Sequence, residues 1–219
     1  MSRPQSGASG QSAGSHEDRG ATKQALRSAT LAARELLTTE MRALAAVAVR
    51  DRVCALPLLD DRIAAVAGSA SLVAAYVSTG TEPGTEPLID ALHDRGVKVI
   101  LPVLRDDLDL DWAGYEPGAW RRGRFGLIEP AGPALGRGAV QAADLVVCPG
   151  LAADRSGHRL GRGGGSYDRV LFRLTAHTTT CLLLYDGELL ESVPAQPHDQ
   201  PVDFVITPTQ TLAGARESS

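Results

Sequence analysis

Two periods of hydrophobic and polar residues alternate along the chain and predict its helices and strands. Apolar side chains recur three and four positions apart over residues 22–37, a helical period, and Thr22 is a candidate N-cap. The same period over residues 39–56, after a start signal at Thr38 and before Pro57, predicts a second helix. Shorter helices are expected over residues 87–96, 166–177 and 187–193.

Continuous apolar runs predict buried strands between these helices, over residues 71–78, 97–104, 143–150, 179–186 and 202–208. A weaker alternating pattern over residues 108–115 predicts an edge strand, whereas residues 116–132 read as a long loop. Strands that alternate with helices indicate a mainly parallel sheet covered on both faces, so we expect a three-layer α/β/α sandwich with a Rossmann-like sheet. Such sheets bind ligands beyond the carboxyl ends of their strands.

The length of 219 residues allows one α/β domain with a sizeable core, which we place at residues 21–211. Residues 1–20 are rich in Ser, Gly and Gln and cannot bury apolar surface, so we expect a disordered N-terminal tail. Residues 212–219 read as a flexible C-terminal tail.

Composition and charge exclude several classes of protein. A net charge of −4 lacks the basic field of a nucleic-acid binder. No apolar run is long enough for a membrane span, and the first residues lack the apolar core of a secretory signal. Cys54, Cys148 and Cys181 are an odd set without metal-ligand spacing, so we expect buried thiols. A monomeric cytoplasmic protein without nucleic-acid or membrane partners fits these features.

Residues 150–171, "GLAADRSGHRLGRGGGSYDRVL", concentrate six glycines and four arginines ahead of a predicted helix. Glycines before a helix let backbone N–H groups approach an oxyanion, and the helix N-terminus adds partial positive charge. Arg159 and Arg162 add forked donors for phosphate or carboxylate. Because Asp168 brings a carboxylate into the same place, a bridging Mg²⁺ is indicated. The alternative is a solvated loop in which Asp168 only favours the helix dipole.

Two common phosphate loops do not fit this stretch. A Walker-type loop needs Gly-Lys before Ser or Thr, and the chain contains no Gly-Lys pair. A dinucleotide fingerprint needs its first glycine directly after a strand, whereas Gly161 comes 13 residues after Cys148 in the preceding predicted strand.

The segment "PGLAADRSGHRLGRGGGSYDRVL" resembles the signature of the 5-formyltetrahydrofolate cyclo-ligases, also called methenyltetrahydrofolate synthetases. Three further segments resemble family motifs in the same order: "KQALR", "YVSTGTEPGTEPLIDAL" and "HDQPVDFVITP". The resemblance covers about residues 22 to 210. It implies an enzyme that uses ATP and Mg²⁺ to convert 5-formyltetrahydrofolate into 5,10-methenyltetrahydrofolate, ADP and phosphate. The formyl oxygen would attack the γ-phosphate of ATP, and N10 would then close the ring with loss of phosphate.

The resemblance also implies roles for individual residues. Catalytic roles fall to Arg162, Tyr167 and Asp168. The ATP-binding set is Lys23, Arg27, Arg159, Leu160, Gly161, Arg162, Gly163, Gly164, Gly165, Ser166 and Tyr167. The set for the folate substrate is Val77, Glu82, Phe125, Arg162, Gly163, Gly164, Gly165 and Ser166, with Glu82 orienting the pterin and Phe125 covering it. Asp168 and Asp203 are the candidate metal ligands.

The chain departs from the family pattern at two positions. Ser166 stands where the family usually has a tyrosine and leaves a small hydroxyl as a helix cap, and Gly164 stands where some members have a lysine. Two other functions remain open on the sequence: a non-catalytic folate or nucleotide binder, and another ATP-using enzyme on the same scaffold.

Overall fold

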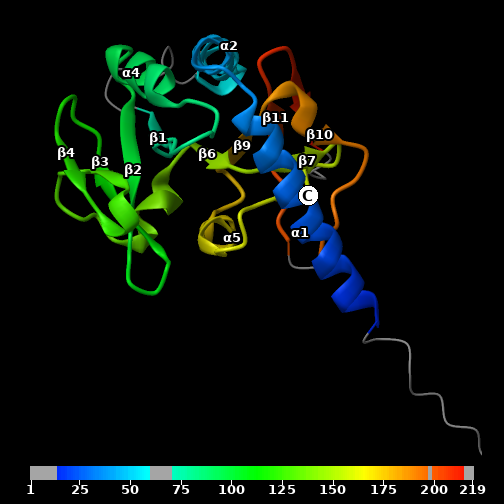
Figure 1. Ribbon diagram of the computed structural model, residues 1–219. Helices are drawn as coiled ribbons and strands as arrows, with labels where there is room; N and C mark the ends of the chain where they lie inside the picture. The colour runs from blue at the N-terminus through cyan, green and yellow to red at the C-terminus, as the bar shows by residue number, and fades with distance from the viewer. Residues whose placement is uncertain (1–13, 60–70, 197–198, 215–219) are drawn as a thin grey trace, which may run out of the picture.

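A seven-stranded, mainly parallel sheet forms the centre of the molecule (Figure 1). The computed structural model describes residues 14–59, 71–196 and 199–214. Along the sheet the strands run β12 (Thr211–Ala213), β11 (Phe204–Ile206), β9 (Thr179–Leu183), β6 (Leu145–Pro149), β1 (Leu72–Ala74), β2 (Lys98–Leu104) and β3 (Leu110–Gly114). The strands from β11 to β2 pair in parallel, and β12 and β3 close the two edges as antiparallel strands. The predicted sheet type and the edge strand over residues 108–115 are confirmed.

Helices cover both faces of this sheet. Successive residues of each strand point to opposite faces, so neighbouring residues of one strand pack against different helices. Val73 packs on α2 (Thr39–Cys54) and α4 (Glu86–Asp94) in one buried cluster. The next residue, Ala74, belongs to a second cluster with α5 (Ser166–Arg173) and the 3₁₀ helix η2 (Arg137–Ala142). The three-layer α/β/α arrangement is therefore confirmed.

The N-terminal helix α1 (Gly14–Glu35) begins well before the predicted start, so Thr22 lies inside the helix and does not cap it. The tail border placed at residue 20 falls within α1, and residues 1–13 lie outside the described residues. Figure 1 shows α1 running past the small sheet β10-β7-β8 and projecting beyond the rest of the molecule. That sheet consists of β7 (Ala152–Asp154), β8 (Arg159–Leu160) and β10 (Leu189–Leu190).

Several other boundaries differ from the prediction. The loop expected over residues 116–132 contains a hairpin of β4 (Trp120–Arg122) and β5 (Ile128–Pro130) around the 3₁₀ turn η1 (Arg124–Gly126). The helix expected over residues 187–193 is the 3₁₀ turn η3 (Asp186–Glu188) followed by β10. The strand β12 occupies residues placed at the border of the C-terminal tail, of which residues 215–219 lie outside the description. No helix in the described part of the chain is long and apolar enough to span a membrane.

Candidate functional site

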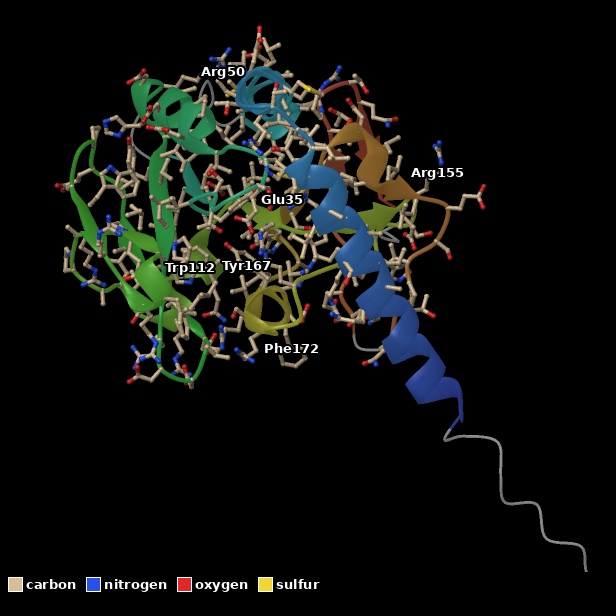
Figure 2. The ribbon with its side chains drawn as sticks, viewed as in Figure 1. Glu35, Arg50, Trp112, Arg155, Tyr167 and Phe172 are labelled. Atoms are coloured by element: carbon tan, nitrogen blue, oxygen red, sulfur yellow. The ribbon has the colours of Figure 1, made fainter. Side chains whose placement is uncertain are left out.

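A cavity of about 280 Å³ opens beyond the carboxyl ends of the central strands, where the fold predicted a ligand site. Tyr76 and Val77 reach it from the end of β1, and Pro149 and Gly150 reach it from the end of β6. Tyr167, on the first turn of α5, lies between that helix and the sheet (Figure 2). The cavity is therefore built where the sheet, α5 and the segment before α5 meet.

The two sides of the cavity differ in chemistry. One side is apolar and comes from β1, β2, β3 and the β4–β5 hairpin. Its lining residues are Val77, Pro102, Leu104, Leu110, Leu127 and Ile128. The other side is the glycine loop, residues 161–165, between β8 and α5. The glycine-loop side of the cavity is thus suited to an anion, and the apolar side is suited to a flat ring system.

The glycine loop needs glycine at Gly163 and Gly165, whose φ angles of +96° and +71° lie in the left-handed region. The helix α1 supports the loop from outside, since Nε of Arg27 donates to the carbonyl oxygen of Gly161 at 2.9 Å. Leu160 does not line the cavity; it is buried below the loop and packs in a cluster with Leu26 of α1. The side chain of Leu160 thus supports the loop by packing, and its contact with ATP stays a prediction.

Four of the predicted charged residues meet at the cavity wall as two ion pairs. Arg159 pairs with Asp168, and its side chain is only 6% exposed whereas that of Asp168 is 62% exposed. Arg162 pairs with Glu82 across the cavity, with Nε 3.1 Å from Oε1. Two polar atoms in this wall, Nε of Arg159 and the hydroxyl of Tyr167, are buried without a hydrogen-bond partner among the described residues.

Tyr167 is held as a neutral donor. Burial raises the pKa of its hydroxyl well above the usual value of 10.0, and the charge of Glu82 adds to the rise. The phenol is protonated at neutral pH, as an ordinary tyrosine is, and the upward shift of its pKa does not change that state.

Ser166 lines the cavity but does not act as the predicted helix cap. Gly165 occupies the N-cap position without a side-chain bond, and the hydroxyl of Ser166 donates to the carbonyl oxygen of Leu108 at 2.6 Å. The loop between β2 and β3 is thereby tied to the start of α5.

Three other predicted residues lie apart from the cavity wall. Lys23 pairs with Asp199 at 3.4 Å. Phe125 is 76% exposed, has a left-handed φ of +52° and stacks on Arg124, so it does not cover the cavity. Asp203 precedes β11, and its Oδ2 accepts two hydrogen bonds from Thr180 near the start of β9. Asp203 is not among the residues that line the cavity, and its role as a metal ligand stays a prediction.

Sequence reasoning missed the buried pair that fixes α1 to the cavity. Nε and Nη2 of Arg34 donate to the two carboxylate oxygens of Glu188 at 2.6 and 2.8 Å, and Nη2 also donates to the carbonyl oxygen of Gly150 at 2.7 Å. The Arg34 side chain is 1% exposed. Burial acts to lower its pKa, but pairing with Glu188 outweighs this and the pKa is raised. The stretch "ATLAARELL" does not set Arg34 apart from its neighbour Glu35, so the sequence carries no signal for this pair.

The residues around Glu82 also escaped the sequence analysis. The backbone N–H and the hydroxyl of Thr79 donate to Oε2 of Glu82 at 2.8 and 3.1 Å. The Tyr185 hydroxyl donates to the carbonyl oxygen of Glu82 at 3.2 Å. These contacts fix one oxygen of the carboxylate and leave the other facing Arg162.

The described residues contain no group of three or more His, Cys, Asp and Glu side chains placed to hold a metal ion. Asp168 is the exposed carboxylate on the glycine-loop side of the cavity. A metal at this place would take one protein carboxylate and complete its shell from bound substrate and water, an arrangement that Mg²⁺ prefers to an all-protein cage.

Comparisons with known proteins agree with this geometry. The model of the 5-formyltetrahydrofolate cyclo-ligase family matches residues 19–208. A protein of Mycolicibacterium smegmatis named 5-formyltetrahydrofolate cyclo-ligase is 42% identical over 153 residues, which are 68% of this chain and 79% of the relative. A protein of the same name from Escherichia coli strain K12 is 32% identical over 145 residues, which are 64% of this chain and 80% of the relative.

Solved structures show the same fold. The NMR structure of the Aquifex aeolicus 5,10-methenyltetrahydrofolate synthetase superimposes with a TM-score of 0.73 at 26% identity, over 90% of this chain and 94% of that one. The Mycoplasma pneumoniae enzyme of the same name, at 19% identity, matches in fold with a TM-score of 0.66 over 85% of this chain and 98% of that one. The chain is a member of the 5-formyltetrahydrofolate cyclo-ligase family of enzymes.

Proposed function

We propose that the protein closes the ring of 5-formyltetrahydrofolate to give 5,10-methenyltetrahydrofolate, with ATP converted to ADP and phosphate. The observation that carries the proposal is the two-sided cavity. An arginine-flanked glycine loop faces an apolar wall across one space, so a polyphosphate and a reduced pterin have adjoining places in it.

On the ATP side, the glycine loop offers backbone N–H groups and the N-terminus of α5 to phosphate oxygens. Arg159 and Arg162 line the same side and add charge-assisted bonds. Arg27 adds a third guanidinium behind the loop and holds the carbonyl oxygen of Gly161 away from the phosphate. Lys23 lies one turn before Arg27 on α1, where it pairs with Asp199, and a phosphate would have to compete with that carboxylate for it.

On the folate side, the apolar wall packs against the ring and Glu82 faces its N–H donors. Glu82 is suited to this task because Thr79 fixes one of its oxygens and leaves the other directed at the cavity. The Tyr167 hydroxyl is a buried donor without a partner among the described residues, and it would bond an oxygen acceptor of the substrate.

The residues present fit a bound Mg²⁺. Asp168 would hold the ion, and Arg159 keeps that carboxylate at the cavity wall. When bound with ATP, the ion supplies charge neutralisation for the transferred phosphoryl group.

The chemistry then needs little covalent help from the protein. The formyl oxygen attacks the γ-phosphorus of ATP, and the bond between that phosphorus and the ADP oxygen breaks. N10 then attacks the activated carbon and gives up its proton to water, and the carbon–oxygen bond breaks with release of phosphate. The protein has to hold the two reactants in line and stabilise the charge on the phosphoryl oxygens. The donors of the glycine loop, Arg159 and Arg162 do the second, and the apolar wall excludes water from the activated carbon.

The test is a direct assay of the purified protein. With 5-formyltetrahydrofolate, ATP and Mg²⁺ we expect the absorbance of the methenyl product and an equal amount of ADP, and neither without ATP. Arg162→Ala should lose most turnover. Arg155→Ala is the matched control, because Arg155 lies in the turn between β7 and β8, at the edge of the molecule away from Tyr167 (Figure 2). Release of ADP without the methenyl product would identify a different ATP-using enzyme.

A further inference from the structure

Arg162 and Glu82 serve different substrates in the proposed function, yet in this structure they bind each other. They lie 80 positions apart in the sequence, on the glycine loop and on the loop after β1, and Nε of Arg162 lies 3.1 Å from Oε1 of Glu82. The pair therefore joins the ATP side of the cavity to the folate side.

The two partners differ in how firmly they are held. Glu82 is 10% exposed and accepts two hydrogen bonds from Thr79, and Tyr185 bonds its backbone carbonyl. Arg162 is 50% exposed and sits among glycines. When a competing donor reaches Oε1, the arginine is the partner that moves.

A pterin ring supplies such a donor, because its amino group and ring N–H form a pair that matches a carboxylate. Occupation of Oε1 releases the guanidinium of Arg162 next to the N–H groups of the glycine loop, where a polyphosphate is its natural partner. The reverse also holds, since a phosphate that draws Arg162 away uncovers Oε1 for the pterin.

We propose that the Arg162–Glu82 ion pair couples the two substrate sites, so that each substrate binds more tightly once the other has broken the pair. This inference rests on the proposed function and adds to it an energetic link between the two binding events. The coupling is reciprocal, as linkage requires. For a half-exposed ion pair its size is about threefold to fivefold in affinity.

The experiment measures binding without turnover. A non-hydrolysable ATP analogue with Mg²⁺ is titrated calorimetrically into the full-length protein, with and without saturating 5-formyltetrahydrofolate. In the parent protein, the folate should lower the dissociation constant of the analogue about threefold to fivefold. In Glu82→Gln the arginine is released from the start, so the analogue alone should bind about as tightly as it binds the folate-loaded parent.

Glu86→Gln is the matched control. Glu86 is an exposed carboxylate four positions on, at the start of α4, so the variant loses the same charge without touching Arg162. It should bind the analogue as the parent does. Arg162→Gln should weaken the binding of the analogue, and the folate should no longer change its dissociation constant. This variant tests the coupling even if Glu82→Gln does not fold.

The outcomes separate the coupling from the proposed function. If the parent makes the methenyl product but Glu82→Gln and Glu86→Gln bind the analogue equally, the coupling is wrong and the function stands. If the folate still strengthens the analogue in Arg162→Gln, the coupling runs through other residues and the inference is overturned. If the parent neither binds the analogue nor forms product, both proposals fall together.

Discussion

Replacing Arg34 by methionine tests how strongly α1 is fixed to the cavity. Methionine keeps much of the length of the side chain but removes three charge-assisted hydrogen bonds, two to Glu188 and one to Gly150. Glu188 keeps the bond from the backbone N–H of Tyr185 at 2.9 Å, and its side chain is 8% exposed. The variant thus leaves a buried carboxylate without its counter-ion.

The expected cost follows from this burial. Breaking a buried ion pair by removing one partner costs about 3–5 kcal/mol, because the remaining charge stays desolvated. For a protein of this size that loss lowers the melting temperature by roughly 6–20 °C. Removing both charges costs less, so Arg34→Met with Glu188→Leu should be about 2 kcal/mol more stable than Arg34→Met alone.

Urea denaturation followed by tryptophan fluorescence measures these differences, since Trp112 is fully buried on β3 of the central sheet (Figure 2). Arg50→Met is the control, because Arg50 lies on α2 and pairs with the exposed Asp51, and it should change the free energy of unfolding by less than about 0.5 kcal/mol. A loss below about 1 kcal/mol in Arg34→Met, or a double variant no more stable than the single one, would refute the reasoning.

Four further predictions concern the site and its supports. Asp168→Asn should lose most turnover and need much more Mg²⁺; normal turnover in a titration at limiting Mg²⁺ would exclude Asp168 as the metal ligand. Arg27→Ala should raise the KM for ATP more than the KM for the folate in steady-state kinetics, whereas equal increases would assign Arg27 to packing. Burial acts to raise the pKa of Asp109, but hydrogen bonds from Arg173 and from the backbone outweigh it, and the pKa is lowered. The ionised carboxylate therefore stabilises the folded protein fully above about pH 4, and this stabilisation is lost as the pH falls further. Acid unfolding of Asp109→Asn should show a weaker pH dependence than that of the parent. Gly157→Ala places a methyl group against the carbonyl oxygen of Val202 at a φ of +86°, so its melting temperature should fall by several degrees, and an unchanged value would show that the turn adapts.

Periodicity predicted most of the sheet because its strands are buried on both faces. The run around Cys148 and the run around Leu182 are continuously apolar, and they pair in parallel in the centre. The β4–β5 hairpin escaped because Trp120–Arg122 is exposed throughout, so no alternation marks it as a strand. The two strands are instead held by contacts between them, such as the ion pair of Arg121 with the buried Glu129.

The motif predicted which residues surround the cavity but not how each one is used. The glycine loop, Arg159, Arg162 and Glu82, which the motif marks as binding residues, all line one cavity, and their contacts with substrates stay a prediction. Ser166 was expected to cap α5, but Gly165 takes that position and the hydroxyl turns to Leu108 instead. Such a choice depends on a partner 58 residues away, which local pattern does not contain.

Residues whose role is set by a distant partner were the hardest to place. Arg34 lies next to the exposed Glu35 in an ordinary helical stretch, and its burial follows from Glu188 far along the chain. Asp203 follows a family motif, yet its carboxylate is taken up by Thr180 of the neighbouring strand. A sequence does not show whether a carboxylate accepts hydrogen bonds from another part of the protein, as that of Asp203 does, or is available to a ligand.

The contacts of α1 also have a consequence for synthesis on the ribosome. Arg27, Arg34 and Lys23 bind partners 134, 154 and 176 positions later in the chain. At about 5–20 residues per second, α1 is made roughly 7 to 35 s before those partners. During that time a helix with an unpaired Arg34 and an uncovered Leu26 must stay soluble, because these contacts form only after the later residues have been made. A nascent chain that stops short of Glu188 holds the whole glycine loop but lacks the counter-ion that fixes α1 beside it.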